Sequence, residues 1–211
     1  MANSTDYLSH AVTGAGILTD KWFPSSAPNQ WVPDDYWRTP VICTLLVDLM
    51  AQTKQVDYTA TLENARTAGE NYLTTCGYYD DLTWWGRFFM HAYSYFQSQS
   101  DAAMAKPYLA DAMIVCDQLS QAWDAWDSPQ FCGGGIWWMR PPSPPPATNK
   151  FKASNSTLGF METALNLYFE LGDRKYLDLG QKAWDWIAQH QFVDNEGLVW
   201  GALTNDCKVD P

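Results

Sequence analysis

Hydrophobic side chains recur along most of the chain at three- and four-residue spacings, which is the period of an amphipathic α-helix. The clearest series consists of Leu82, Trp85, Phe89, Ala92 and Phe96. The same spacing predicts five more helices, over Ile42–Leu49, Tyr58–Cys76, Leu109–Trp123, Leu158–Tyr168 and Leu177–Ile187. Asp6–Trp22 is a seventh and less regular helical segment. The chain is therefore predicted to be all-α.

The connections between these helices carry their own signals. Gly172-Asp173 predicts the end of one helix and the capped start of the next. Only two segments have a pattern compatible with a short strand, Gly135–Met139 and Leu198–Leu203. The proline-rich stretch over residues 139–149 is expected to be an exposed loop between two helices. Because no Gly-Ser linker or charge block interrupts the pattern, residues 1–211 are predicted to be a single domain.

Composition narrows the classes of ligand. Thirteen Lys and Arg against 24 Asp and Glu give a net charge of −11, which disfavours nucleic acid and anionic lipid. No apolar run of about 18 residues is present, so no transmembrane segment is expected. Met1–Asp20 shows no secretory signal. Trp, Tyr and Phe make up 15% of the chain, which fits either a large aromatic core or flat surfaces for a neutral ligand such as a sugar.

The five cysteines and three histidines give no metal-ligand spacing, so no metal is expected. An odd number of cysteines fits buried thiols, or two disulfides with one thiol left over. Cys116 and Cys132 are close enough in sequence to bridge, although sequence order does not fix the pairing. Asn3 and Asn155 begin N-glycosylation patterns, which favours an extracellular protein.

Two pairs of neighbouring aspartates are surrounded by aromatic residues: Asp34-Asp35 and Asp80-Asp81. The second pair stands at the start of the clearest helix, where one aspartate can cap the free N–H groups. The same pair also suits glycoside hydrolysis, in which a retaining enzyme uses two carboxyl groups about 5–5.5 Å apart as nucleophile and acid. Repulsion and nearby indoles would keep one carboxyl protonated, while the helix N-terminus would keep the other ionised.

The stretch Tyr79–Gly86 resembles the central motif of glycoside hydrolase family 76, the α-1,6-mannanases, which include fungal cell-wall transglycosidases. The resemblance continues in Gly133–Trp138, Lys152, Leu171–Leu177, Gly197–Val199 and Asn205–Cys207, whereas Trp200 before Gly201 departs from the family, which tends to have Asp there. It implies an (α/α)6 toroid of helical hairpins with the acid pair at one end. It also implies that Asp80 is the nucleophile and Asp81 the acid/base, with no cofactor; Asp34-Asp35 does not match the motif.

The resemblance also implies substrate contacts, and the candidates are Tyr79, Trp84, Trp85, Gly134, Trp137, Trp138 and Asn155. Adjacent helical positions cannot share a face, so Trp84 is the better sugar contact and Trp85 the better core residue. Gly134 would let the backbone approach a ligand closely, and Trp137 or Trp138 would stack on it, with a core role for one of the two tryptophans as the alternative. The asparagine register after Lys152 is shifted relative to the family, which leaves Asn155 as the candidate there.

The predicted function is therefore a retaining endo-glycosidase that acts on α-1,6-linked mannan or mannooligosaccharides, in a fungal extracellular or cell-wall setting. A cell-wall transglycosidase is one alternative. A non-catalytic carbohydrate-binding or interaction fragment is the other, because the chain holds about seven helices where the toroid needs about twelve. An N-terminal part of a toroid would expose apolar helix faces, which allows self-association.

Overall fold

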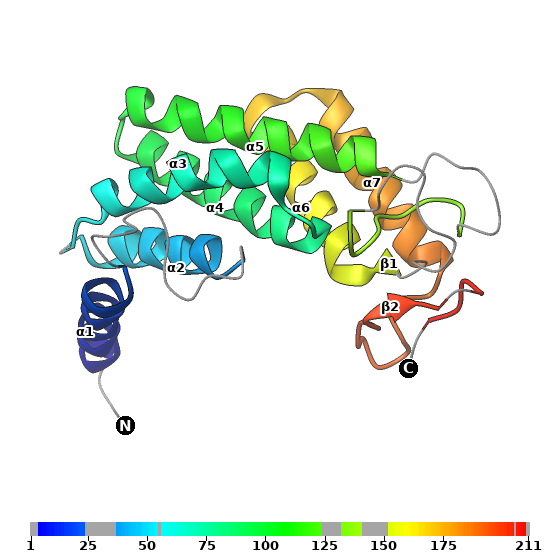
Figure 1. Ribbon diagram of the computed structural model, residues 1–211, viewed down its shortest axis with the longest axis horizontal. Coiled ribbons are helices and arrows are strands. Elements are labelled where there is room, and N and C mark those ends of the chain that lie inside the picture. Colours follow the sequence, from blue (N-terminus) through cyan, green and yellow to red (C-terminus); the bar gives the residue numbers. More distant parts are fainter. Residues whose placement is uncertain are drawn as a thin grey trace. The chain divides into compact units, whose positions relative to one another are not determined.

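The structure is a computed structural model that describes residues 4–23, 37–54, 56–123, 132–140, 152–204 and 206–209. These residues form seven α-helices: α1 Ser4–Trp22, α2 Arg38–Thr53, α3 Thr59–Thr75, α4 Tyr79–Ser98, α5 Ala102–Ala122, α6 Ser154–Leu171 and α7 Arg174–Gln189 (Figure 1). They also form two short strands, β1 Lys152–Ala153 and β2 Ala202–Leu203. All seven predicted helices, and with them the all-α class, are confirmed.

The chain divides into two compact units, and helices α4 and α5 contribute residues to each. One unit contains Met1–Thr75 and Phe88–Leu109, and the other contains Cys76–Arg87 and Ala110–Pro211. Every predicted substrate or catalytic residue from Tyr79 to Asn155 belongs to the second unit. The single domain expected over residues 1–211 stays a prediction.

The first unit is built around Tyr108, which is fully buried. Its ring lies 5.6–6.4 Å from three phenylalanine rings, those of Phe88, Phe89 and Phe96. On α2 the buried apolar residues are Cys43, Leu46, Val47 and Met50. The predicted stripe through Leu45 is wrong, since Leu45 is 61% exposed. Several adjacent apolar residues on α2 satisfy helical spacing on two different faces, and only packing selects one.

In the second unit α6 and α7 form consecutive helices that lie side by side (Figure 1). Gly172 ends α6 with a left-handed backbone (φ 67°), and its N–H donates to the Tyr168 carbonyl. The Asp173 carboxylate then caps α7 by accepting the Lys175 N–H at 3.0 Å. The predicted stop and start signals are therefore confirmed.

Extended backbone is sparse in the second unit. β1 and β2 pair antiparallel, with Lys152 opposite Leu203 and Ala153 opposite Ala202. Of the two predicted strand segments, Leu198–Leu203 contributes β2 at its end. Gly135–Met139 makes only isolated bridges, from Ile136 to Trp123 and from Met139 to Tyr78.

A disulfide joins Cys132 to Cys207, 75 residues apart in the sequence. The prediction that Cys116 and Cys132, which are close in sequence, could form a disulfide is therefore wrong. Among the described residues, Cys43, Cys76 and Cys116 are buried and not in a disulfide. Sequence distance misled here because the chain folds back through α6 and α7 before it reaches Cys207.

Replacing Cys207 by serine is expected to lower the free energy of unfolding by about 2–5 kcal/mol, because the disulfide restricts a long loop in the unfolded chain. Urea unfolding of the oxidised protein and the variant measures this difference. A reductant should destabilise the parent and leave the variant unchanged. Equal stability of parent and variant under oxidising conditions would contradict this role.

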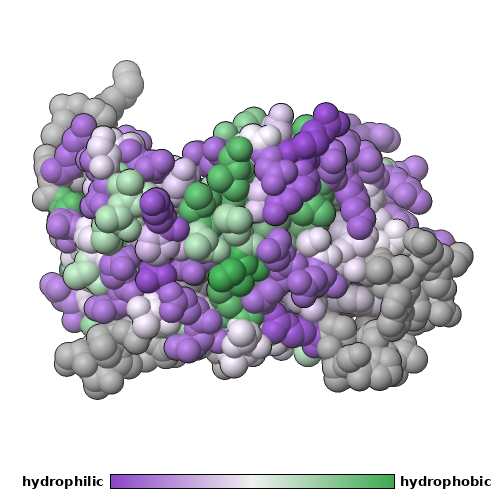
Figure 2. All heavy atoms as spheres, turned by 90° about the horizontal axis from the view of Figure 1, so that it is seen from above, coloured by the Kyte–Doolittle hydropathy of each residue, from purple (hydrophilic) through white to green (hydrophobic). Residues whose placement is uncertain are grey.

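Within the described parts of the chain, no helix is long and apolar enough to span a membrane. Figure 2 shows hydrophobic residues exposed among hydrophilic ones on the face that it presents. The large exposed apolar side chains include Leu45, Ile114, Phe169 and Trp184. Self-association through such residues stays a prediction. Asn3, Asp34-Asp35 and residues 141–149 of the expected loop lie outside the described residues.

Candidate active site

The start of α4 is held by a short antiparallel pairing with the segment that follows the glycines. The Tyr79 N–H donates to the Trp138 carbonyl at 2.8 Å, and the Arg140 N–H donates to the Gly77 carbonyl at 2.8 Å. Asp80 follows directly, in the first turn of α4. This pairing places the Trp138 side chain next to the acid pair.

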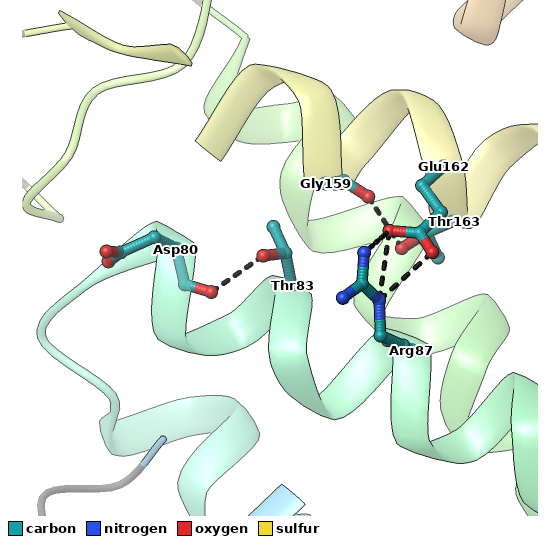
Figure 3. A network of polar contacts seen from close by, with 6 residues as sticks. All are labelled: Asp80, Thr83, Arg87, Gly159, Glu162 and Thr163. Carbon is teal, nitrogen blue, oxygen red and sulfur yellow. Dashed lines mark hydrogen bonds and ion pairs between the residues drawn. The ribbon is translucent and has the colours of Figure 1, made fainter. Parts of the chain in front are cut away.

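Helices α4 and α6 run in the same direction from this point (Figure 3). A Cβ atom on Gly159 would lie 2.7 Å from Thr83 Cγ2, and one on Gly86 would lie 2.8 Å from Thr163 Oγ1. These close approaches require glycine at both positions. One turn further, Arg87 and Glu162 form a bidentate ion pair, with N–O distances of 2.5–3.1 Å.

The Asp80 carboxylate accepts three hydrogen bonds. Its Oδ2 accepts the Trp138 indole N–H at 2.9 Å and an Asn155 amide N–H at 3.0 Å. Its Oδ1 accepts the backbone N–H of Asp81 at 3.0 Å, as a carboxylate in a first helical turn commonly does. Because α4 and α6 both begin here, their N-terminal dipoles favour a negative charge at this point.

Asp81 occupies a different environment, since it is only 7% exposed. The Cys76 thiol lies close enough to both carboxyl groups for their charges to affect its pKa. Burial raises the pKa of Cys76 to about 11, and the charges of Asp81 and Asp80 act in the same direction, against a backbone hydrogen bond with Tyr78 and the charge of Arg140. The acid pair therefore has a half-buried, strongly hydrogen-bonded member and a buried one.

The two tryptophans of α4 divide as their positions predict. Trp85 is fully buried and belongs to the core, so it does not line a surface. Trp84 is half-buried, and the Arg87 guanidinium lies over its ring at 5.1 Å from the centroid. Contact of Trp84 with a sugar stays a prediction.

The glycines approach indole rings rather than an open surface. Gly134 is buried, and a Cβ there would lie 2.8 Å from the Trp123 ring. Lys152 is fully buried, and its ammonium donates to the Gly134 carbonyl and lies 4.7 Å from the Trp137 ring centroid. Trp137 is only 5% exposed. Gly134 and Trp137 therefore anchor this segment internally, which differs from the expected ligand approach and stacking.

Three polar or aromatic candidates do reach the exposed side of the acid pair. Trp138 is 38% exposed, and Asn155 is exposed in the first turn of α6. Tyr79 is half-buried under Arg140, whose guanidinium lies 5.4 Å from the ring centroid. Burial raises the pKa of Tyr79, against the charge of Arg140. The Asn155 amide donates a hydrogen bond to Asp80. Glycosylation of Asn155 stays a prediction.

Sequence reasoning assigned no role to Arg140 or Cys76, and none to Lys152 beyond its place in the motif. The proximity of Arg140 to the acids depends on the pairing of residues 77–79 with 138–140, for which the sequence carries no alternation signal. In the described part of the chain, no group of three or more His, Cys, Asp or Glu residues could hold a metal ion.

The order of these elements matches a known family. The model of glycosyl hydrolase family 76 matches residues 11–210. The chain belongs to this family. Helices α2–α7, the acid pair and the disulfide all fall inside the matched range. No curated protein matches the chain in sequence.

Solved structures of family 76 proteins share the fold. An inactive α-1,6-mannanase from Salegentibacter sp. HEL1_6 in complex with α-1,6-mannotriose has 20% identity and a TM-score of 0.70, over 93% of this chain and 55% of that one. Dfg5 from Chaetomium thermophilum in complex with glucosamine has 19% identity and a TM-score of 0.76, over 97% and 53%. A Bacteroides thetaiotaomicron α-mannanase has 17% identity and a TM-score of 0.68, over 99% and 60%.

The chain thus spans between 53% and 60% of the length of these family 76 structures. At these identities the likeness shows the fold, and the expected relation to the helical toroid of the family is confirmed.

Proposed function

We propose that this family 76 chain acts on α-1,6-linked mannan as a retaining endo-glycosidase, with Asp80 as the nucleophile and Asp81 as the acid/base. The observation that carries the proposal is the unequal environment of the two carboxyl groups. Asp80 accepts hydrogen bonds from Asp81, Trp138 and Asn155 at the start of α4 and α6, which hold its carboxylate in one place as a nucleophile requires. Asp81 is only 7% exposed beside it, and a buried carboxyl group next to a more exposed one is the arrangement that divides the roles of acid and nucleophile in glycosidases.

The reaction follows from these roles in two steps. In the first, an oxygen of Asp80 attacks the anomeric carbon while Asp81 gives its proton to the departing glycosidic oxygen, so a glycosyl ester forms as the glycosidic bond breaks. In the second, Asp81 takes a proton from water, and the water oxygen displaces Asp80 from the anomeric carbon. Two inversions leave the anomeric configuration unchanged.

Two features of the Salegentibacter enzyme support this assignment. The inactive variant carries asparagine in place of two consecutive aspartates, and it was captured with α-1,6-mannotriose. In the described part of this chain, Asp80-Asp81 is a corresponding pair of consecutive aspartates. It lies in the first turn of α4, beside an exposed aromatic side chain and an exposed amide. Tyr79, next to Asp80 on α4 and half-buried, offers an aromatic surface for a mannose ring.

An extracellular or cell-wall location forms part of the proposal. The Cys132–Cys207 disulfide supports it, because structural disulfides persist in oxidising compartments. A fungal origin stays a prediction from the sequence alone.

Transglycosylation is the second candidate, and the Chaetomium thermophilum Dfg5 structure favours it with a TM-score of 0.76 and bound glucosamine. The chemistry differs only in the second step, where a sugar hydroxyl replaces water. The same two aspartates serve both outcomes.

Incubation with linear α-1,6-mannotetraose, beside its α-1,2-linked counterpart, tests the proposal. Shorter products from the α-1,6 substrate alone support endo-hydrolysis, and longer products support transfer. Binding without cleavage would favour the carbohydrate-binding alternative. If a folded chain neither cleaves nor binds either substrate, the proposal is wrong.

A further inference from the structure

The two side chains that donate to Asp80 Oδ2 come from segments far apart in the sequence, and each is fixed by contacts of its own. The Trp138 carbonyl accepts the Tyr79 N–H, and the Trp138 ring packs 5.0 Å from the Tyr78 ring. Its neighbour Trp137 points the other way and is buried against Lys152. The Trp138 indole N–H is therefore directed at Asp80 by the backbone and not by a sugar.

The amide of Asn155 is oriented just as firmly. Its Oδ1 accepts the backbone N–H of Ser156 at 3.0 Å, so Nδ2 is the atom left to face Asp80. The first turn of α6 holds this residue through Ser154, whose backbone N–H donates to the Gly201 carbonyl at 2.9 Å. Gly201 is next to β2, so the β1–β2 pairing supports the position of Asn155.

The count of lone pairs on Asp80 follows from these contacts. A carboxylate oxygen accepts about two hydrogen bonds in its plane, and Oδ2 already accepts from Trp138 and Asn155. Oδ1 accepts only the Asp81 N–H among the described residues. One lone pair on Oδ1 is thus left to form a bond.

We infer that Trp138 and Asn155 are positioning residues: together they hold Oδ2 of Asp80, keep the carboxylate in one orientation and present Oδ1 to the anomeric carbon. This inference rests on the proposed role of Asp80. It changes the expected roles of both residues from sugar contacts to supports of the nucleophile. Asp81, next to Asp80 on α4, and Arg140, on the paired segment, are charged groups that act together with Asp80 on the Cys76 thiol.

Two substitutions separate positioning from sugar binding. Trp138→Phe keeps an aromatic face for stacking and removes the N–H donor. Asn155→Ala removes the amide. Each is expected to lower kcat on α-1,6-mannotetraose by about 10- to 100-fold, because a hydrogen bond to a charged group is lost, with KM nearly unchanged.

Matched controls come from the same unit. Trp184→Phe changes a tryptophan that is 47% exposed on α7, and Asn166→Ala changes a half-buried asparagine further along α6. Both should leave kcat unchanged. A raised KM at constant kcat in Trp138→Phe and Asn155→Ala would overturn the inference, since it would make them sugar contacts. Unchanged kcat and KM would overturn it too.

The indole N–H of Trp138 gives a readout that needs no activity. Its ¹H–¹⁵N resonance is assigned as the one that Trp138→Phe removes. Asp80→Asn should move this resonance upfield, because the charged acceptor is lost. Asp185→Asn, at an exposed position on α7, should leave it in place. If the parent cleaves no mannan, the proposed function fails while this shift still decides the contact. A resonance that stays in place in Asp80→Asn would overturn the inference.

Discussion

Asp80→Asn is expected to abolish turnover of α-1,6-mannotetraose, because no covalent glycosyl intermediate can form without the nucleophile. The substitution keeps the size of the side chain, and Asp80 is half-buried, so folding should be preserved. Binding of α-1,6-mannotriose, measured by calorimetry, should therefore remain. Turnover is measured as reducing ends released over time.

Asp81→Asn should behave differently from Asp80→Asn, and the difference tests the division of roles. Loss of a general acid lowers kcat on the oligosaccharide by about 10²- to 10⁴-fold. An α-1,6-mannobioside with a dinitrophenyl leaving group needs no proton to depart. Its first turnover should therefore be spared in Asp81→Asn and lost in Asp80→Asn.

Asp185→Asn is the matched control for both substitutions, since Asp185 lies exposed on α7 and, within the described parts of the chain, accepts a hydrogen bond from Gln181 at 2.7 Å. It should have the activity of the parent. Equal loss on the activated substrate in both site variants would contradict the assigned roles. Full activity in either variant would contradict the participation of that aspartate.

Gly135→Ala is expected to destabilise the second unit strongly, although it adds only one methyl group. Gly135 has φ +78°, where a side chain is disfavoured by about 1–2 kcal/mol. An added Cβ would also lie 2.6 Å from Trp186 Cη2, and such overpacking costs about 1–3 kcal/mol. Trp186 cannot yield easily, since its indole N–H donates to the Cys132 carbonyl at 2.9 Å. Urea unfolding should show a loss of about 2–5 kcal/mol.

Gly133→Ala separates the two causes. Gly133 also has a left-handed backbone, with φ +60°, yet among the described residues other than its chain neighbours no atom lies within 4 Å of a Cβ built there. It should lose only the backbone component, about 1–2 kcal/mol. Equal losses in both variants would mean that the contact with Trp186 carries no cost.

Helical periodicity was enough to locate α2–α7, because each of these helices buries one face and the buried positions repeat. The less regular helix α1 has no buried residue among those described. On α4 the predicted stripe from Leu82 to Phe96 is fully buried. Where apolar residues crowd together the stripe was misplaced, as on α7, where Trp184 is 47% exposed and Trp186 is buried. The choice between neighbouring tryptophans depends on partners from distant segments.

The candidate site was predictable only in part for the same reason. Asp80 and Asp81 stand out locally as an acid pair at a helix start. The contacts of Asp80 with Trp138 and Asn155 span 58 and 75 residues, and no local pattern reports them. Gly134 and Trp137 were expected to contact a ligand. Glycine and tryptophan occur both at ligand sites and in cores, so residue type alone does not decide between the two. Burial by Trp123 and Lys152 decides for the core.

The central claim is that Asp80 and Asp81 cleave α-1,6-linked mannose through a covalent intermediate with retention. The most direct test follows the first anomer released from α-1,6-mannotetraose by ¹H NMR, before mutarotation mixes the forms. The account predicts that the α-anomer appears first and that the β-anomer grows in later. Initial release of the β-anomer, or intact substrate in the presence of the folded chain, would contradict it.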